Sequence, residues 1–65
     1  MKKIVDIYPA EFFAENEGTS LDGKLAEMGI EYTMLGLNLG RGCWVIECVP
    51  PENPPAWFHI KNAEE

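Results

Sequence analysis

The side chains best suited to chemistry in this sequence are Cys43, Cys48 and His59. A cysteine beside a histidine can act as a nucleophile, because the imidazole accepts the thiol proton. Such a pair also needs a group that orients the imidazole and a substrate to activate. Both cysteines fall in an apolar stretch, where a thiol usually serves as a small buried hydrophobic group. We therefore expect no enzyme activity, and a small thiol-dependent enzyme is the least favoured alternative.

The same side chains do not match a metal or cofactor site. A structural zinc site takes four ligands at recognisable spacing, whereas the cysteines are five residues apart and the histidine follows eleven residues later. The sequence has no D-x-D-x-D-G calcium loop. Its glycines at 36, 40 and 42 suit strand and turn roles better than a phosphate-binding loop. We expect no metal and no cofactor.

Acidic residues dominate the charge. The chain has 11 Asp and Glu against 5 Lys and Arg, which gives a net charge of -6. This excess disfavours direct binding to nucleic-acid phosphates and to anionic membranes. Between residues 6 and 31, a single lysine, Lys24, accompanies a run of carboxylates: Asp6, Glu11, Glu15, Glu17, Asp22, Glu27 and Glu31.

Charge and size together favour a small acidic protein-interaction module, an inhibitor or regulator that presents carboxylates to a basic protein partner. Nucleic-acid mimicry, as used by small phage-encoded inhibitors, is a specific form of this hypothesis. A solvated face that serves only solubility is the simpler interpretation of the same charges. The residues predicted to bind the partner are Glu11, Glu15, Glu17, Asp22, Glu27, Arg41 and Trp57.

A homodimeric structural or assembly protein is the alternative function. It would use a mixed face of the hairpin described next, or an exposed aromatic side chain. Trp57 and Phe58 are neighbours in an expected strand, so they must face opposite ways. One of the two is therefore predicted to be an exposed anchor for an interface.

Residues 30–49 are predicted to form a β-hairpin around which the rest of the chain is organised. Apolar residues alternate with other residues on both sides of a Gly-Arg-Gly tip. A two-residue turn at 41–42 is favoured. A turn at 40–41 would direct the same side chains to the same face, with different cross-strand partners. The favoured turn pairs Leu39 with Trp44, Leu37 with Ile46 and Leu35 with Cys48, and directs all six side chains inward.

The flanking segments predict short elements that cover the hairpin. Residues 4–8 are a strand candidate, and Pro9 opens a helix to about Asn16 with Phe12 and Phe13 inward. Ser20 is the predicted N-cap of a second helix that ends at Gly29. The proline-rich segment 50–55 is an extended connector, 56–61 is a last strand, and 62–65 is a frayed acidic tail.

These elements predict one α+β domain over residues 1–65, with a small, mostly antiparallel sheet of three or four strands in β-α-β-β-β order and one or two short helices. The strand order stays open. A chain of this size buries only about 60% of its unfolded surface, so a partner or a second copy often stabilises it.

The two cysteines point to opposite faces of one strand, roughly 16 Å apart, which rules out a disulfide between them. Reduced thiols are typical of a cytoplasmic protein. No signal peptide and no membrane-spanning run is recognisable in the sequence.

Overall fold

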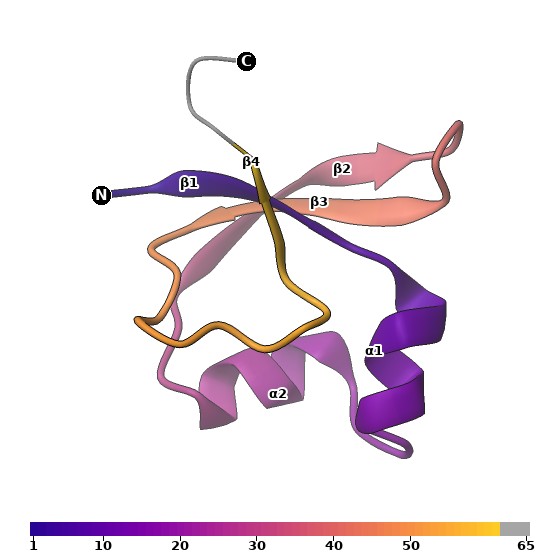
Figure 1. Cartoon of the computed structure of the whole chain (residues 1–65), viewed down its shortest axis with the longest axis horizontal. Helices are drawn as coiled ribbons and strands as arrows, with labels where there is room; N and C mark the ends of the chain where they lie inside the picture. Colours follow the sequence, from indigo (N-terminus) through magenta and orange to yellow (C-terminus); the bar gives the residue numbers. More distant parts are fainter. Residues whose placement is uncertain (62–65) are drawn as a thin grey trace.

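The chain forms a four-stranded antiparallel sheet with two short helices on one face, as the computed structural model in Figure 1 shows. The structure describes residues 1–61. Along the chain lie β1 (Lys3–Ile7), α1 (Pro9–Glu15), α2 (Leu21–Glu27), β2 (Tyr32–Asn38), β3 (Cys43–Cys48) and β4 (His59–Lys61). The strand order is β2-β3-β1-β4. The predicted α+β class and the mostly antiparallel sheet are confirmed, with both helices between β1 and β2.

The junction between α2 and β2 follows the predicted local chemistry. The Ser20 hydroxyl accepts a hydrogen bond from the backbone N–H of Gly23 at 3.0 Å, which caps the helix. At the other end Gly29 has a φ of 74°, a left-handed conformation that favours glycine. The N–H of Ile30 then donates to the carbonyl of Leu25 at 2.9 Å, as in a Schellman ending.

The core lies between the sheet and the helices. The Phe12 ring is fully buried there, with its centroid 4.9 Å from that of Trp57 and 6.1 Å from that of Trp44. Both contacts are edge-to-face, an arrangement that aromatic pairs prefer. The buried members of the core are Val5, Ile7, Phe12, Leu21, Leu25, Ile46, Cys48, Trp57 and Phe58.

The β2–β3 hairpin is present, but the predicted register is wrong. Asn38 pairs with Cys43 and Leu37 with Trp44, so a four-residue loop replaces the two-residue turn. Asn38 begins this loop early, because its Oδ1 accepts from the N–H of Arg41 at 3.1 Å. Earlier in β2, a bulge shifts the pairing between Met34 and Gly36.

The predicted inward facing of the leucines at 35, 37 and 39 is also wrong. Leu35, Leu37 and Leu39 are 50%, 55% and 82% exposed, whereas Ile46 and Cys48 of β3 are buried. Alternation indicates that one side of a strand is apolar, but burial also requires a second layer to cover that side. The two seven-residue helices are each about 10 Å long. They leave the edge strand β2 largely uncovered.

The end of the described chain differs from the prediction as well. Strand β4 has only three residues, because the Phe58 N–H donates to the Pro55 carbonyl at 3.0 Å in a turn before it. Trp57 and Phe58 are therefore both buried, and the expected exposed anchor is absent from this pair. Phe13, predicted to face inward, is 44% exposed. The predicted acidic tail 62–65 lies outside the described residues.

Candidate functional site

Strand β2 forms one border of the sheet, and its apolar side chains are exposed. Its sequence, YTMLGLN, contains neither a charged residue nor a proline. Natural edge strands are usually protected by charge, proline, short length or a bulge, and β2 has only the bulge. We call this border the β2 edge, which consists of the outer side of the strand, the side chains of Met34, Leu35 and Leu37, and that of Leu39 in the loop that follows.

The opposite border of the sheet is built differently. Strand β4 has three residues, two of which, His59 and Lys61, are polar. A short strand with a basic side chain is a poor template for further pairing. Within the described residues, the sheet therefore has one protected border and one open, uncharged border.

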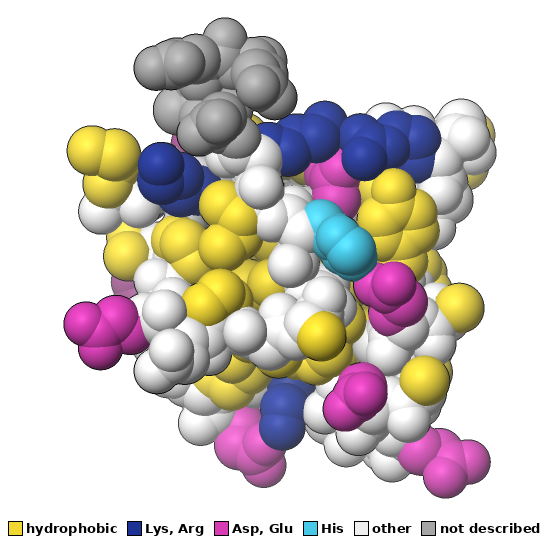
Figure 2. Space-filling model, viewed as in Figure 1, with side chains coloured by type: hydrophobic (Ala, Val, Ile, Leu, Met, Phe, Trp, Pro, Cys, Tyr) yellow, Lys and Arg dark blue, Asp and Glu magenta, His cyan; other side chains and the backbone are white. Residues whose placement is uncertain are grey.

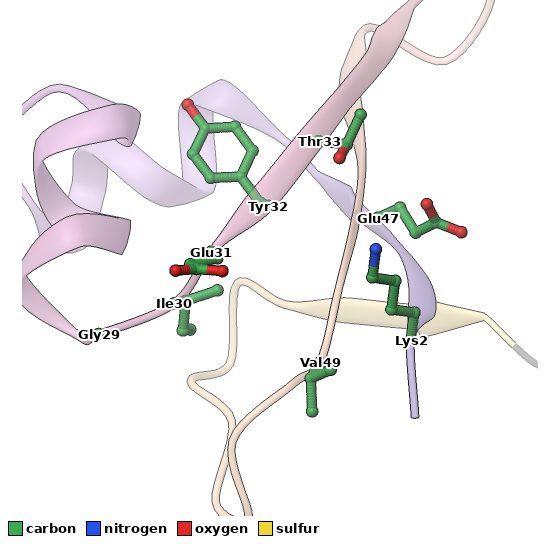
Figure 3. Close-up of a pocket in the computed structure, with 8 residues that line it drawn as sticks. All are labelled: Lys2, Gly29, Ile30, Glu31, Tyr32, Thr33, Glu47 and Val49. Carbon is green, nitrogen blue, oxygen red and sulfur yellow. The ribbon is translucent and has the colours of Figure 1, made fainter.

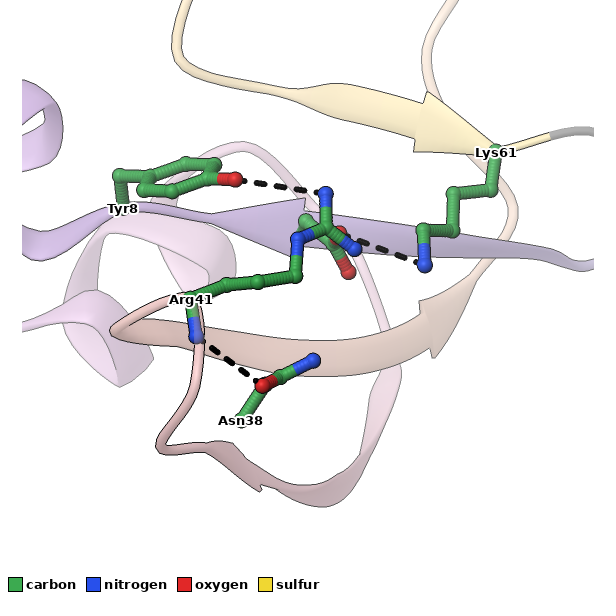
Figure 4. A network of polar contacts seen from close by, with 5 residues as sticks. Tyr8, Asn38, Arg41 and Lys61 are labelled. Atoms are coloured by element: carbon green, nitrogen blue, oxygen red, sulfur yellow. Dashed lines mark hydrogen bonds and ion pairs between the residues drawn. The ribbon is translucent and has the colours of Figure 1, made fainter.

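A second feature is a polar network on the sheet face away from the helices, shown in Figure 4. Asp6 alternates along β1 with the core residues Val5 and Ile7, so its side chain lies on the other face. Its carboxylate is only 1% exposed, and the Arg41 Nη1 lies 2.9 Å from Oδ2 while the Lys61 Nζ lies 3.6 Å from it. Neither Asp6 oxygen accepts a well-aligned hydrogen bond from residues 1–61. These two cations therefore compensate the buried charge.

Arg41 and its surroundings link the hairpin loop to the end of β1. The Tyr8 hydroxyl accepts a hydrogen bond from the Arg41 Nη2 at 3.3 Å. This bond, and then the Asp6 carboxylate, raise the pKa of Arg41 above its ordinary value. The Tyr8 ring also meets the His59 ring edge-on, with centroids 5.2 Å apart. Figure 2 shows the histidine next to a row of basic side chains on this side of the molecule.

The acidic residues predicted to bind a partner do not form one patch. Figure 2 shows acidic side chains spread over the helical side of the molecule. Three of them are engaged within the chain, at distances of 2.6 Å, 2.8 Å and 3.2 Å: Glu11 with His59, Asp22 with the Tyr32 hydroxyl, and Glu27 with Lys24. Glu15 and Glu17 are exposed and have no ion pair within residues 1–61.

The other two predicted residues, Trp57 and Arg41, contact other parts of the fold. Trp57 is in the core, and Arg41 is held against Asp6 with 44% of its side chain exposed. Asp6 itself was not among the predicted site residues. The sequence did indicate that Asp6 matters, because an isolated carboxylate inside the apolar run IVDIY needs a compensating partner. The identity of that partner depends on long-range pairing and could not be derived locally.

Both thiols are free and buried. Cys48 belongs to the core, and its burial raises the pKa of the thiol above the ordinary value of 9.0. A raised pKa lowers the fraction of thiolate, which is the reactive form.

A cavity of about 520 Å³ lies where β2 begins, as Figure 3 shows. It is open, and its charged side chains are all at least partly exposed, so it provides no water-excluded centre for chemistry. Its lining residues are Lys2, Gly29, Ile30, Glu31, Tyr32, Thr33, Glu47 and Val49. In residues 1–61 no three Cys, His, Asp or Glu side chains gather as a metal ion would require.

None of the helices in the described part of the chain is long and apolar enough to cross a membrane. Comparisons with protein-family models, curated proteins and solved structures give no match to this chain, so its own surface carries the functional argument.

Proposed function

We propose that this protein is a small protein-interaction module that binds through the β2 edge. The observation that supports the proposal is an uncharged, seven-residue border strand with large apolar side chains left exposed. Exposed contiguous apolar surface is typical of an interaction site. An unpaired strand border can also add a strand from another chain, with backbone hydrogen bonds for affinity and alternate side chains for specificity.

The energetic reason is the cost of leaving these side chains in water. Burying a fully exposed leucine contributes about 1.5–3 kcal/mol. Leu39 is 82% exposed, and Leu35 and Leu37 are about half exposed. A partner that covers them therefore gains free energy without needing any charged contact.

The acidic surface supports a second candidate, an inhibitor or regulator that binds a basic partner and includes nucleic-acid mimicry as a special case. Glu15 and Glu17 favour it, since they are exposed and carry no ion pair within residues 1–61. It is the weaker candidate, because Glu11, Asp22 and Glu27 already contact side chains of the same chain.

The two candidates are separated by paired variants in a partner-capture experiment. Leu37→Lys places a charge on the β2 edge, whereas Glu15→Gln with Glu17→Gln neutralises the free acids. Val49→Lys is the matched control, because Val49 is 53% exposed, close to the 55% of Leu37, and lies outside β2. Circular dichroism checks that each variant is folded.

We expect the Leu37→Lys variant to lose its partner, and the double amide and the control to retain it. Binding by the wild type should depend little on salt, because few charges lie at the β2 edge. The opposite pattern, in which the amides abolish a steeply salt-dependent interaction and Leu37→Lys binds normally, would support the acidic candidate instead.

A further inference from the structure

We infer that an open cavity beside α1 binds an arginine side chain of a partner protein, through the carboxylates of Glu11 and Glu15. The cavity lies between α1 and the turn that precedes β4. It shares no residue with the β2 edge, so the inference goes beyond the proposed function. Its lining residues are Glu11, Ala14, Glu15, Ala56 and Trp57.

The size and the walls of the cavity fit a single long side chain. Its volume is about 200 Å³, below the roughly 300–1,000 Å³ of pockets that hold whole small molecules. Trp57 is 4% exposed and lies at the bottom, whereas Ala14 and Ala56 are exposed at the rim. These apolar groups can cover the methylene stem of a basic side chain while its charged end stays near water.

The charge of the cavity selects a cation, because both of its ionisable lining residues are acidic. Glu11 and Glu15 are four positions apart on α1, which places them on one side of the helix with Cβ atoms about 5–6 Å apart. Glu15 has no ion pair within residues 1–61. Glu11 contacts His59 through Oε1 at 2.6 Å, and a carboxylate has a second oxygen that can accept. A guanidinium group, with five donors in a planar fork, can bridge two such carboxylates.

A neighbouring cavity of about 420 Å³ shares Glu15 and Trp57 with the first one. It is also lined by Lys24, whose ammonium group lies 3.2 Å from the carboxylate of Glu27. A lysine at this end disfavours a second cation there. The arginine therefore belongs at the Glu11 end.

The position of Glu15 does not help α1 to fold. Glu15 is the last residue of the helix, where the free carbonyl groups disfavour a negative charge, and the last turn contains no basic residue. Glu11 and Glu15 also repel each other, as like charges four positions apart do. A residue that costs local stability is typical of a functional position. A bound guanidinium group would offset both unfavourable terms.

The test is an NMR titration of the isotope-labelled full chain with a blocked peptide, acetyl-Ala-Ala-Arg-Ala-Ala-amide. The control peptide carries citrulline, a neutral side chain of nearly the same shape as arginine. We expect the arginine peptide to shift the signals of Glu15, Ala56 and the Trp57 indole N–H, and the citrulline peptide to leave them unchanged. Equal shifts from both peptides, shifts confined to other residues, or no shifts at all would overturn the inference.

A pair of variants separates the cavity from the general acidity of the chain. Glu15→Gln should raise the dissociation constant of the arginine peptide roughly threefold to fivefold, as the loss of one partly exposed ion pair does. Its melting temperature should stay equal or rise, because a charge that is unfavourable at the helix end is removed. Glu17→Gln is the matched control, since Glu17 is exposed and lines neither cavity. Equal weakening by both variants would overturn the inference.

The inference and the proposed function can fail separately. Leu37→Lys alters the β2 edge and should bind the arginine peptide as the wild type does. Loss of the peptide through Leu37→Lys would place its site at the β2 edge and overturn the inference. Loss through Glu15→Gln alone supports the inference, whatever Leu37→Lys does to the partner of the β2 edge.

Discussion

The guanidinium group of Arg41 lies 2.9 Å from the carboxylate of Asp6, which joins the loop of the β2–β3 hairpin to the C-terminal end of β1. The Asp6 side chain is 1% exposed, and that of Arg41 is 44% exposed. Arg41 therefore compensates the buried charge of Asp6, while the rest of its side chain stays in contact with solvent. This position fixes the loop that follows the β2 edge.

Removing Arg41 should destabilise the fold, because the Asp6 carboxylate would keep only Lys61 nearby. We expect Arg41→Gln to lower the melting temperature more than Lys24→Gln. Lys24→Gln removes only a surface ion pair, worth about 0.5 kcal/mol or less. Adding Asp6→Asn to Arg41→Gln should cost less than the sum of the two single changes. Fully additive losses in thermal denaturation would contradict the coupling.

The Ser20 cap is the basis of a second prediction. Ser20→Ala removes the acceptor for the Gly23 N–H and should lower the unfolding free energy by about 1 kcal/mol. For a domain of this size, that corresponds to a fall of roughly 4–8 °C in the melting temperature. Ser20→Asp keeps an acceptor and should retain most of the stability. Equal losses in both variants would show that the cap contributes little.

The parts of the fold that sequence reasoning predicts correctly depend on local chemistry. Ser20 and Gly29 determine the limits of α2 through bonds to residues a few positions away. The register of the hairpin was missed because a bulge occurs at Leu35 and the Asn38 side chain then begins the loop early. Neither effect changes the hydrophobic alternation on which the prediction depended.

The candidate site could be predicted only in part. The alternation at Leu35 and Leu37 identifies apolar side chains, but whether they are covered depends on helix length and strand order. Likewise, the Asp6 carboxylate needs a partner, and only the tertiary structure brings Arg41 and Lys61 to it. Sequence reasoning therefore identified the residue types without their surroundings.

The contact between Tyr32 and Asp22 predicts a pH dependence. The Tyr32 hydroxyl donates to the Asp22 Oδ1 at 2.8 Å, and this bond raises the pKa of Tyr32 above 10.0. Because the pKa is higher in the folded than in the unfolded state, the stabilisation is fully present below pH 10.0 and is lost as the pH rises through the folded-state pKa. Asp22→Asn should return the pKa towards 10.0, as measured by NMR titration of the ring carbons. An unchanged pKa would exclude the Asp22 carboxylate charge as its cause.

The two cysteines should react slowly with a thiol reagent in the folded protein. Both are 0% exposed, and burial raises the pKa of Cys48 above 9.0. Spectrophotometric labelling should accelerate strongly when the chain is unfolded in denaturant. Rapid labelling of either thiol under native conditions would revive the thiol-dependent enzyme that the sequence made least favoured.

The short, basic β4 limits how far the sheet can grow. It is the border of the sheet opposite β2, and its three residues include His59 and Lys61. Such a border is a poor template for the strand stacking that builds fibres. A strand added at the β2 edge would therefore extend the sheet on that side alone, because β4 would not extend it on the other.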